Sequence, residues 1–470
     1  MVNQLYENQL VRKGDACFTE LHFRNIQPTF MQEKARRRTR DKGRVSTVEM
    51  QIAARARSYP DEALTNLHQF IDEEFLHECY KILNKQSASG VDQQTWEDYN
   101  EERKDRIPQL LTAFKSGSYK APNIRRVYIP KEDGKQRPLG LPTMEDKLLQ
   151  TAVNKVLTPV YEQIFYNGSY GFRPGKSQHQ ALEELFNEVS FKKKRYIIDA
   201  DIKNYFGSIN HARLREVLDL KIKDGVIRKM IDKWLKAGIQ EESQVVYPTE
   251  GTPQGGTISP LLSNVFLHYV LDDWFIKQIQ PLLKGESFLI RFADDFLLGF
   301  TNVEDAKRVM EVLGKRFEKY GINLHPEKTK LVKLSDNDED QGEATFDFLG
   351  FTHYMSKSRK GKPILKRKTS RKKLRGALVR MNKWIKANRH SPFLEGLIAD
   401  LNRKLRGYYQ YYGVTFNSRQ LVNYYERVKR MLFKWVNRRG AREHLTWEQF
   451  VLRIHVWSPL EKPRIYHQFF

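Results

Sequence analysis

Two adjacent carboxylates, Asp294 and Asp295, stand between two short apolar segments of the chain. The segments 288–293 and 296–300 are rich in Phe, Leu and Ile, which is typical of buried strands. A tight turn between two such strands would bring both carboxylates out at one point. Carboxylate oxygens are the ligands that a hard cation such as Mg²⁺ prefers. The pattern therefore indicates a metal site at the tip of a hairpin.

A third carboxylate, Asp201, ends another apolar segment that has the composition of a strand, residues 196–202. Two strands that each bring a carboxylate to one point can hold two Mg²⁺ ions about 3.5–4 Å apart, which is the chemistry of nucleotidyl transfer. Asp199 faces the same way in a strand and suits a supporting role. An Asp-Asp pair taken alone is more often merely solvated, so other segments must decide between the two interpretations.

Further motifs follow one another in a fixed order along about two thirds of the chain. Together with Asp201 and the acidic pair they form seven ordered blocks, and the additional segments are 125–142, 170–177, 251–260, 325–330 and 346–351. This order resembles the reverse transcriptases that group II introns encode. Residues 89–92 and 117–122 are similar to the N-terminal extension of that family, and residues 405–412 to the start of its maturase, or X, region.

The resemblance implies an α+β fold: a right-hand polymerase with fingers and a palm built on an antiparallel sheet, followed by a helical thumb and maturase domain. The expected division is a basic N-terminal extension (1–60), helices of the extension and fingers (61–124), fingers and palm (125–356), thumb and maturase domain (357–440) and a C-terminal tail (441–470). The polar segment 356–363 contains Gly and Pro, and it suggests a hinge between palm and thumb.

The family pattern also implies which residues hold the metal. Asp201, Asp294 and Asp295, with the backbone of Ile202, would bind two Mg²⁺ ions, for which Mn²⁺ could substitute. Asp201 and Asp294 would bridge the ions, and Asp295 would support them. All three acids are present, which argues against a chain that has lost polymerase activity.

The incoming nucleotide would be held by residues of several blocks. The resemblance implies that Lys131 and Arg137 neutralise its triphosphate and that Gln254 and Gly255 hold its base and sugar. Phe206 would exclude a 2′-hydroxyl, which predicts DNA synthesis instead of RNA synthesis.

Two further motifs have more than one interpretation. Lys328 could be a general acid for the departing pyrophosphate or could simply screen phosphate charge. Phe348, Leu349 and Gly350 are expected to form the primer grip, and palm packing is the alternative.

Three positions depart from the usual family pattern. Phe292 stands where most relatives carry Tyr, which removes a hydroxyl and keeps the aromatic surface. Gly207 and Asn210 stand where many relatives carry Asp, so local hydrogen bonding after the first catalytic strand is expected to differ. The metal ligands are not affected.

Charge supports a nucleic-acid partner, because 81 Lys and Arg against 57 Asp and Glu give a net charge of +24. Residues 357–440 hold 25 basic and three acidic side chains, and the rest of the chain is close to neutral. The aromatic residues of this region could stack on bases or pack helices together. The basic run 34–44 could contact RNA or be a solvated arm. The expected RNA-binding residues are Arg371, Lys372, Lys373, Arg403, Lys404, Arg406, Tyr408 and Tyr409.

The remaining features concern location and partners. Cys17 and Cys79 form no Cys-x-x-Cys pair, so no zinc site is expected, nor the metal-binding HNH endonuclease domain in which many relatives end. No run of 18 apolar residues is present, so no membrane contact is expected. We predict a cytoplasmic, bacterial protein that is associated with the nucleoid when it is bound to DNA. The expected partners are a structured intron RNA or another RNA template, a DNA primer or target, and dNTPs. A monomer and a dimer both stay open.

Two other functions stay open beside the intron-associated polymerase that also assists splicing. One is a maturase that binds intron RNA without polymerising. The other is a free-standing, domesticated reverse transcriptase in DNA repair or phage defence, whose sequence could look nearly the same. Residues 171–177 resemble a phosphate-binding P-loop, but the spacing between the two glycines is one residue shorter than in that motif. A P-loop function is therefore not expected.

Overall fold

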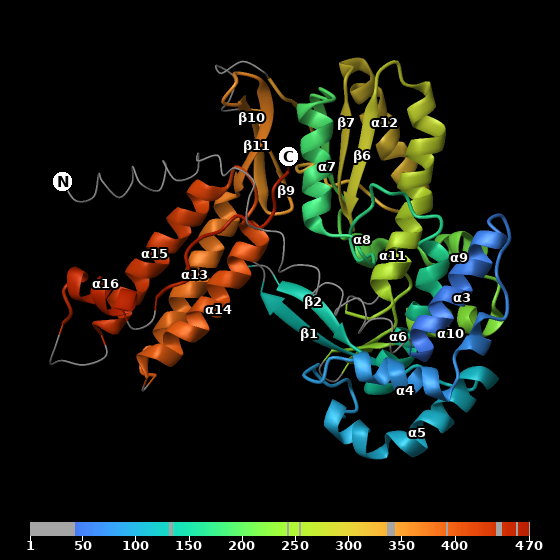
Figure 1. Cartoon of the computed structure of the whole chain (residues 1–470). Coiled ribbons are helices and arrows are strands. Elements are labelled where there is room, and N and C mark those ends of the chain that lie inside the picture. The colour runs from blue at the N-terminus through green and yellow to red at the C-terminus, as the bar shows by residue number, and fades with distance from the viewer. Residues whose placement is uncertain are drawn as a thin grey trace, which may run out of the picture.

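The structure is a computed structural model, in which a large α+β body and a smaller helical body are joined by a small sheet (Figure 1). The α+β body runs from helix α3 to strand β8, and the helical body runs from α13 to α16. The described residues are 43–130, 134, 136–241, 244–252, 255–335, 344–391, 393–438, 444–456 and 459–469.

The N-terminal side of the α+β body is a cluster of helices around α6, whose residues are mostly buried. Local sequence sets where these helices begin: Asp72 caps α4, and Thr95 forms a capping box with Asp98 at α5. These helices share one hydrophobic core with the helices of the palm. The cluster comprises α3 (Arg44–Ser58), a short 3₁₀ helix (Leu67–Phe70), α4 (Glu73–Ile82), α5 (Trp96–Ser116), α6 (Met144–Tyr161), α9 (His211–Asp219) and α10 (Gly225–Lys236).

The fingers contain a four-stranded sheet in the order β2-β1-β4-β5. Strands β1 and β2 form an antiparallel hairpin, β4 joins β1 in parallel, and β5 returns antiparallel to β4. Residues 136–141 of this sheet belong to the first block of the sequence resemblance. The strands are β1 (Ile124–Pro130), β2 (Gln136–Leu141), β4 (Ile239–Glu241) and β5 (Gln244–Val246).

The palm is an antiparallel sheet in the order β6-β7-β3-β8. Alternate residues of its strands enter two different cores: Ile198 packs with residues of α12, and Ile197 packs with residues of α7. Because helices cover both faces, most residues of the strands β3, β6 and β7 are apolar, and Asp199, Asp201 and Arg291 are among the exceptions. The elements are α7 (Gln178–Ser190), β3 (Tyr196–Asp201), α8 (Tyr205–Ser208), α11 (Ser259–Leu267), β6 (Ser287–Phe292), β7 (Asp295–Phe300), α12 (Val303–Lys319) and β8 (Lys330–Lys333).

A three-stranded sheet connects the palm to the helical body. Its strands β9 (Phe346–Phe348), β10 (Phe351–Lys357) and β11 (Pro363–Thr369) pair antiparallel in the order β11-β10-β9. The segment 356–363, expected to be a hinge, is instead the turn region of the β10–β11 hairpin, in which Lys357 pairs with Pro363. The Gly and Pro content that suggested a hinge is also what a tight turn requires.

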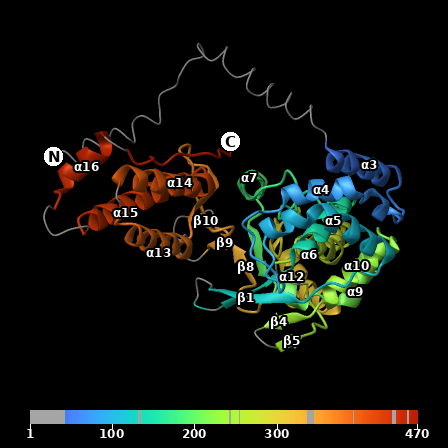
Figure 2. The same ribbon diagram turned by 90° about the horizontal axis from the view of Figure 1, so that it is seen from below.

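The helical body has its own core, which lies between α13 (Arg371–Ala387), α14 (Leu394–Tyr412), α15 (Ser418–Val436) and α16 (Trp447–Val456). Figure 2 shows α13, α14 and α15 side by side, with the small sheet between them and the N-terminal helices. Residues near the C-terminal end return to the segment that follows α14, where His467 pairs with Val414.

The predicted fold class is confirmed, because an α+β polymerase-like body precedes a helical domain. The antiparallel palm sheet also agrees with the prediction. No helix among the described residues is long and apolar enough to cross a membrane.

Candidate active site

The acidic pair lies at the β6–β7 hairpin. Strand β6 ends at Phe292 and β7 begins at Asp295, so Ala293 and Asp294 form a two-residue loop. Ala293 has a φ of +59°, whereas Asp294 is not in the left-handed region. This is the φ pattern of a type II′ turn, in which glycine usually takes the first position. An alanine in that conformation costs about 1–2 kcal/mol, so surrounding contacts must stabilise the turn.

The neighbouring strand β3 brings Asp201 to the same place. Asp201 pairs directly with Asp295 in the antiparallel β3–β7 ladder. Directly opposite residues have their side chains on one face of the sheet, with Cβ atoms about 4.5–5.5 Å apart. The predicted meeting of two acidic strands is therefore present in the backbone register.

The electrostatics of the site are those of crowded carboxylates. Burial raises the pKa of Asp294, and the charge of Asp201 raises it further, while the guanidinium of Arg137 lowers it. Burial also raises the pKa of Asp295 well above its ordinary value, and Asp199, Asp294 and Asp201 add to that rise. A cation that binds beside such a carboxyl group stabilises its charged form.

Two lysines partly neutralise these acids. The Nζ atom of Lys328 lies 2.5 Å from Oδ2 of Asp201, and the Lys328 side chain is 60 % exposed. Lys330 Nζ lies 3.9 Å from Oδ2 of Asp199. Burial raises the pKa of Asp199 to about 6, and Lys330 opposes that rise.

The donor set fits a hard divalent cation, because it consists of carboxylate oxygens that repel one another on one face of the palm sheet. Ile202, whose carbonyl is the fourth expected ligand, is buried directly after β3. Among the residues that the structure describes, no three His, Cys, Asp or Glu side chains converge closely enough to enclose a metal ion. The assignment of metal ligands therefore stays a prediction.

The fingers approach the acids through Arg137, whose charge acts on Asp294. Gly255 has a φ of +112°, and a Cβ there would lie 2.3 Å from the carbonyl oxygen of Gly140 in β2. Only glycine allows this contact, so the 251–260 block is joined to the fingers sheet. Lys131 and Gln254 lie outside the described residues, and their expected roles stay predictions.

The same block also holds Phe206 in helix α8. The backbone N–H of Thr252 donates to the Phe206 carbonyl at 2.7 Å. A Cβ on Gly251 would lie 2.9 Å from both the Phe206 carbonyl oxygen and Cα of Gly207. The position expected to exclude a 2′-hydroxyl is therefore fixed by close backbone packing.

The two departures after β3 have local explanations. Gly207 faces Asn204, because a Cβ on Gly207 would lie 2.5 Å from its Nδ2. Asn210 is the N-cap of α9, where its side chain accepts hydrogen bonds from the backbone N–H groups of Ala212 and Arg213. Asn caps helices about as well as Asp does.

The expected primer grip is the β9–β10 turn. Phe348 is buried, while Leu349 and Gly350 have φ values of +50° and +81°, the pattern of a type I′ hairpin. The Tyr411 hydroxyl of α14 donates to the Leu349 carbonyl at 3.1 Å. This turn therefore contacts the C-terminal end of α14, and its role toward a primer stays a prediction.

The expected RNA-binding residues divide into two groups. The cationic side chains are exposed on α13 and α14, except for Lys373, which is half-buried; they are Arg371, Lys372, Lys373, Arg403, Lys404 and Arg406. The two tyrosines are not on this surface. Tyr409 is fully buried, and Tyr408 stacks on Tyr424 with ring centroids 3.7 Å apart.

The prediction that Tyr409 stacks on RNA is therefore wrong. Its ring belongs to the core of the helical body, and its hydroxyl donates to the Glu461 carbonyl at 3.1 Å. Tyr408 likewise packs helix α14 against α15. Both tyrosines lie close to exposed cations in the sequence. The helical period nevertheless places the tyrosines on the inner face of the helix.

None of the sequence motifs above assigns a role to Arg291, yet its guanidinium contacts the turn that bears Asp294. It donates to the Ala293 carbonyl at 3.0 Å and pairs with Asp272 inside the protein. The available signal was a charged residue within an otherwise apolar strand, since charges are almost never fully buried unless paired.

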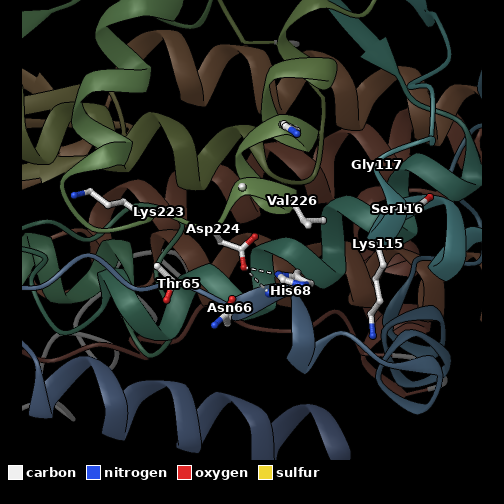
Figure 3. Close-up of a pocket in the computed structure, with 11 residues that line it drawn as sticks. Thr65, Asn66, His68, Lys115, Ser116, Gly117, Lys223, Asp224 and Val226 are labelled. Carbon is white, nitrogen blue, oxygen red and sulfur yellow. Dashed lines mark hydrogen bonds and ion pairs between the residues drawn. The ribbon is translucent and has the colours of Figure 1, made fainter.

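A cavity of about 410 Å³ lies elsewhere, between residues 65–68, the end of α5 and the start of α10 (Figure 3). Asp224 receives hydrogen bonds there from the His68 ring at 2.8 Å and the His68 backbone N–H at 2.9 Å. Asp224 also caps α10 through Ile227. None of the expected site residues lines this cavity, so we assign Asp224 to the packing of the N-terminal helices.

Comparison with protein families agrees with this geometry. A family described as reverse transcriptase (RNA-dependent DNA polymerase) matches residues 129–353. The maturase-specific domain of group II introns matches residues 366–450. A match to a reverse transcriptase domain is thus followed along the chain by a match to a maturase-specific domain. The chain is similar to the reverse transcriptases and maturases that group II introns encode.

Individual relatives support the assignment. Group II intron-encoded protein LtrA of Lactococcus lactis subsp. cremoris is 38% identical over 232 residues, which are 48% of this chain and 38% of LtrA. Protein YkfC of Escherichia coli strain K12 is 29% identical over 358 residues, 67% of this chain and 90% of YkfC. An uncharacterized 91 kDa protein in a cob intron of Schizosaccharomyces pombe is 39% identical over 176 residues, 37% of this chain and 21% of that protein. The match to LtrA thus spans about two fifths of LtrA.

Proposed function

We propose that the chain is an RNA-directed DNA polymerase of group II intron type, and that its helical domain binds a structured intron RNA and assists its splicing. One observation carries the polymerase proposal: the β3–β7 register pairs Asp201 with Asp295, beside the turn that bears Asp294. The reverse transcriptase match over residues 129–353 supports the same activity.

The acids Asp201, Asp294 and Asp295, with the Ile202 carbonyl, would hold two divalent cations. When bound, these cations lower the pKa of an attacking hydroxyl and stabilise the leaving oxygen. The substrates of the proposed reaction are a dNTP and the 3′ end of a DNA primer on an RNA template.

The chain's own residues would orient these substrates. Arg137 lies where its charge reaches Asp294, so it would pair with the triphosphate. Phe206 would exclude the 2′-hydroxyl of a ribonucleotide. Lys328, already within 2.5 Å of Asp201, would donate a proton to pyrophosphate or screen its charge. The Leu349–Gly350 turn would contact the primer.

The test is magnesium-dependent incorporation of dNTPs on an RNA template with a DNA primer. Wild-type protein should synthesise DNA, and Asp294→Ala should reduce synthesis to background. Asp105→Ala is the control, because Asp105 is an exposed acid on α5. Well-folded wild-type protein that incorporates no nucleotide would refute the polymerase proposal.

The same assay repeated with rNTPs tests the sugar selection. Phe206→Val should accept ribonucleotides better than wild type does, because it shortens the side chain that would meet the 2′-hydroxyl. Unchanged selectivity in an active Phe206→Val variant would count against this role.

A maturase role is favoured by the exposed cations of α13 and α14 and by the match of residues 366–450. It is tested by retention of a structured group II intron RNA on a filter. Replacing Arg371 and Lys372 together by Ala should weaken retention without lowering the melting temperature. Equal retention by wild type and variant, at every salt concentration, would place the RNA contact elsewhere.

A further inference from the structure

Arg291 is a fully buried cation beside the catalytic turn. Its side chain and that of Asp272 are both 0 % exposed. The guanidinium contacts Asp272 with two parallel hydrogen bonds, Nε to Oδ1 at 2.8 Å and Nη2 to Oδ2 at 2.5 Å. Asp272 ends a π-helical segment, His268–Asp272, that follows α11. The bidentate contact fixes the plane of the guanidinium.

The third nitrogen of the guanidinium points to the turn. Nη1 donates to the Ala293 carbonyl at 3.0 Å and to Oδ1 of Asn264 at 2.9 Å. Ala293 is the residue with the unfavourable φ of +59°, and Asp294 follows it. The guanidinium of Arg291 therefore holds the peptide that precedes Asp294. The side chains of Asp272 and Asn264 orient that guanidinium.

The opposite side of the turn is held by residues 168–171, which precede α7. A Cβ on Gly171 would lie 2.3 Å from the backbone nitrogen of Ala293. Asn264 Nδ2 donates to the Gly171 carbonyl at 2.8 Å. Backbone hydrogen bonds of 2.8 Å also join Arg291 to Gly168 and to Tyr170. The turn thus lies between Arg291 on one side and Gly171 on the other, and Asn264 contacts both.

We propose that Arg291, oriented by Asp272 and Asn264, is a positioning residue for the polymerase reaction. It holds the Ala293–Asp294 turn in the conformation that directs the Asp294 carboxylate toward Asp201. Arg291 itself touches no reacting atom, because its polar atoms are occupied inside the protein. The inference rests on the proposed polymerase function and concerns the same site.

The alternative is that the ion pair serves stability alone. The two roles separate when both charges are removed together, because replacing a buried ion pair with apolar residues is often neutral for stability. The single variant Arg291→Met would leave Asp272 buried without its partner and could fail to fold. The informative variant is therefore the double substitution Arg291→Met with Asp272→Leu.

The experiment measures the melting temperature, the single-turnover rate of dNTP incorporation and the Mg²⁺ concentration for half-maximal rate. The double variant should melt close to wild type, yet its rate should fall roughly 100-fold, the scale expected for a misplaced catalytic group. The Mg²⁺ requirement should rise, because Asp294 is a predicted metal ligand. A folded double variant with wild-type rate and Mg²⁺ requirement would overturn the proposal.

A second variant keeps the test decisive if the double variant does not fold. Asn264→Ala leaves the ion pair in place and removes the contacts from Asn264 to both Arg291 and Gly171. It should also lower the rate and raise the Mg²⁺ requirement, by less than the double variant. A folded Asn264→Ala protein with unchanged rate and Mg²⁺ requirement would overturn the proposal as well.

The matched control removes another buried ion pair, Lys194 with Glu188. Lys194 lies just before the first residue of β3, at the end of the strand away from Asp201. Lys194→Met with Glu188→Leu should leave the Mg²⁺ requirement unchanged. The wild-type rate separates the two levels of inference. An inactive wild type refutes the polymerase function itself, whereas an active wild type with an equally active double variant refutes only the role of Arg291.

Discussion

The palm hairpin and the helical domain use charge in opposite ways. Beside the hairpin, Arg291 and Asp272 are fully buried and pair with each other. On α13 and α14 the cations lie on the surface, and the buried positions belong to aromatic and aliphatic side chains such as Tyr409. The palm therefore orients single charged side chains, whereas the helical domain carries many exposed cations on its surface.

This difference has an energetic basis. Burying a charge is costly unless hydrogen bonds and an opposite charge compensate it, so each palm substitution should have a large and specific effect. An exposed cation is hydrated, and its contribution to binding a phosphate chain is small and shared among many.

The largest effect is expected for Asp294→Asn. Synthesis of DNA should fall to background, because an amide cannot replace a metal-binding carboxylate. The melting temperature at neutral pH should stay equal or rise, since burial and Asp201 disfavour the charged form of Asp294. Differential scanning calorimetry beside the incorporation assay checks both. A marked loss of stability would contradict the interpretation of crowded carboxylates.

Gly171→Ala should follow in size. Its Cβ would meet the Ala293 backbone, which cannot move aside as a flexible side chain could, so the incorporation rate should fall roughly 100-fold. Gly314→Ala in α12 is the control, because a Cβ there meets no atom within 4 Å, and it should keep the wild-type rate. Equal rates for the two variants would show that the turn tolerates displacement.

The sheet between the two regions predicts a pH effect. Burial, with Arg367 nearby, holds the pKa of His353 well below its usual 6.5. His353 therefore stays neutral in the folded chain, while it gains a proton in the unfolded chain below about pH 6.5. The contribution of His353 to the free energy of unfolding should be fully present above that pH. It should decrease as the pH falls, by at most about 1.4 kcal/mol per pH unit.

Urea unfolding of wild type and His353→Phe at several pH values measures that contribution. The variant should lose less stability than wild type between pH 6.5 and 5.5. His390→Gln is the control, because His390 is exposed, and its pH dependence should match wild type. Identical slopes for wild type and His353→Phe would argue against a buried neutral imidazole.

Tyr409→Phe tests the inner face of the helical domain. Losing the hydroxyl that donates to Glu461 should cost about 0.5–1.5 kcal/mol of unfolding free energy, measured by urea titration. RNA affinity should not change, because the ring is buried. A loss of RNA affinity without a loss of stability would return Tyr409 to the RNA surface.

The smallest effect is expected for Lys372→Ala on the outer face. RNA affinity should fall only a few-fold, and the slope of log affinity against log salt should decrease by about one. Filter binding over a salt series provides both values. Val379→Ala is the control on the same helix, because Val379 is exposed and uncharged. An unchanged slope for Lys372→Ala would remove this lysine from the phosphate contacts.

Much of the site was predictable because its acids lie at strand ends. Asp201, Asp294 and Asp295 each adjoin an apolar run, and the period of two in a strand predicts which neighbours share a face. The hairpin at residues 357–363 was not predictable in the same way. Gly, Pro and polar residues occur in hinges and in tight turns alike, and only the pairing of β10 with β11 distinguishes them.

Composition and periodicity were enough to predict the local pattern: which segments form strands and helices, where carboxylates follow them, and that the excess positive charge lies in residues 357–440. The folded structure was needed to show that Arg291 reaches Asp272 and the Ala293–Asp294 turn, and that Tyr409 faces inward. The physical reason is that composition and period act along the chain, whereas burial depends on which distant segments cover a side chain.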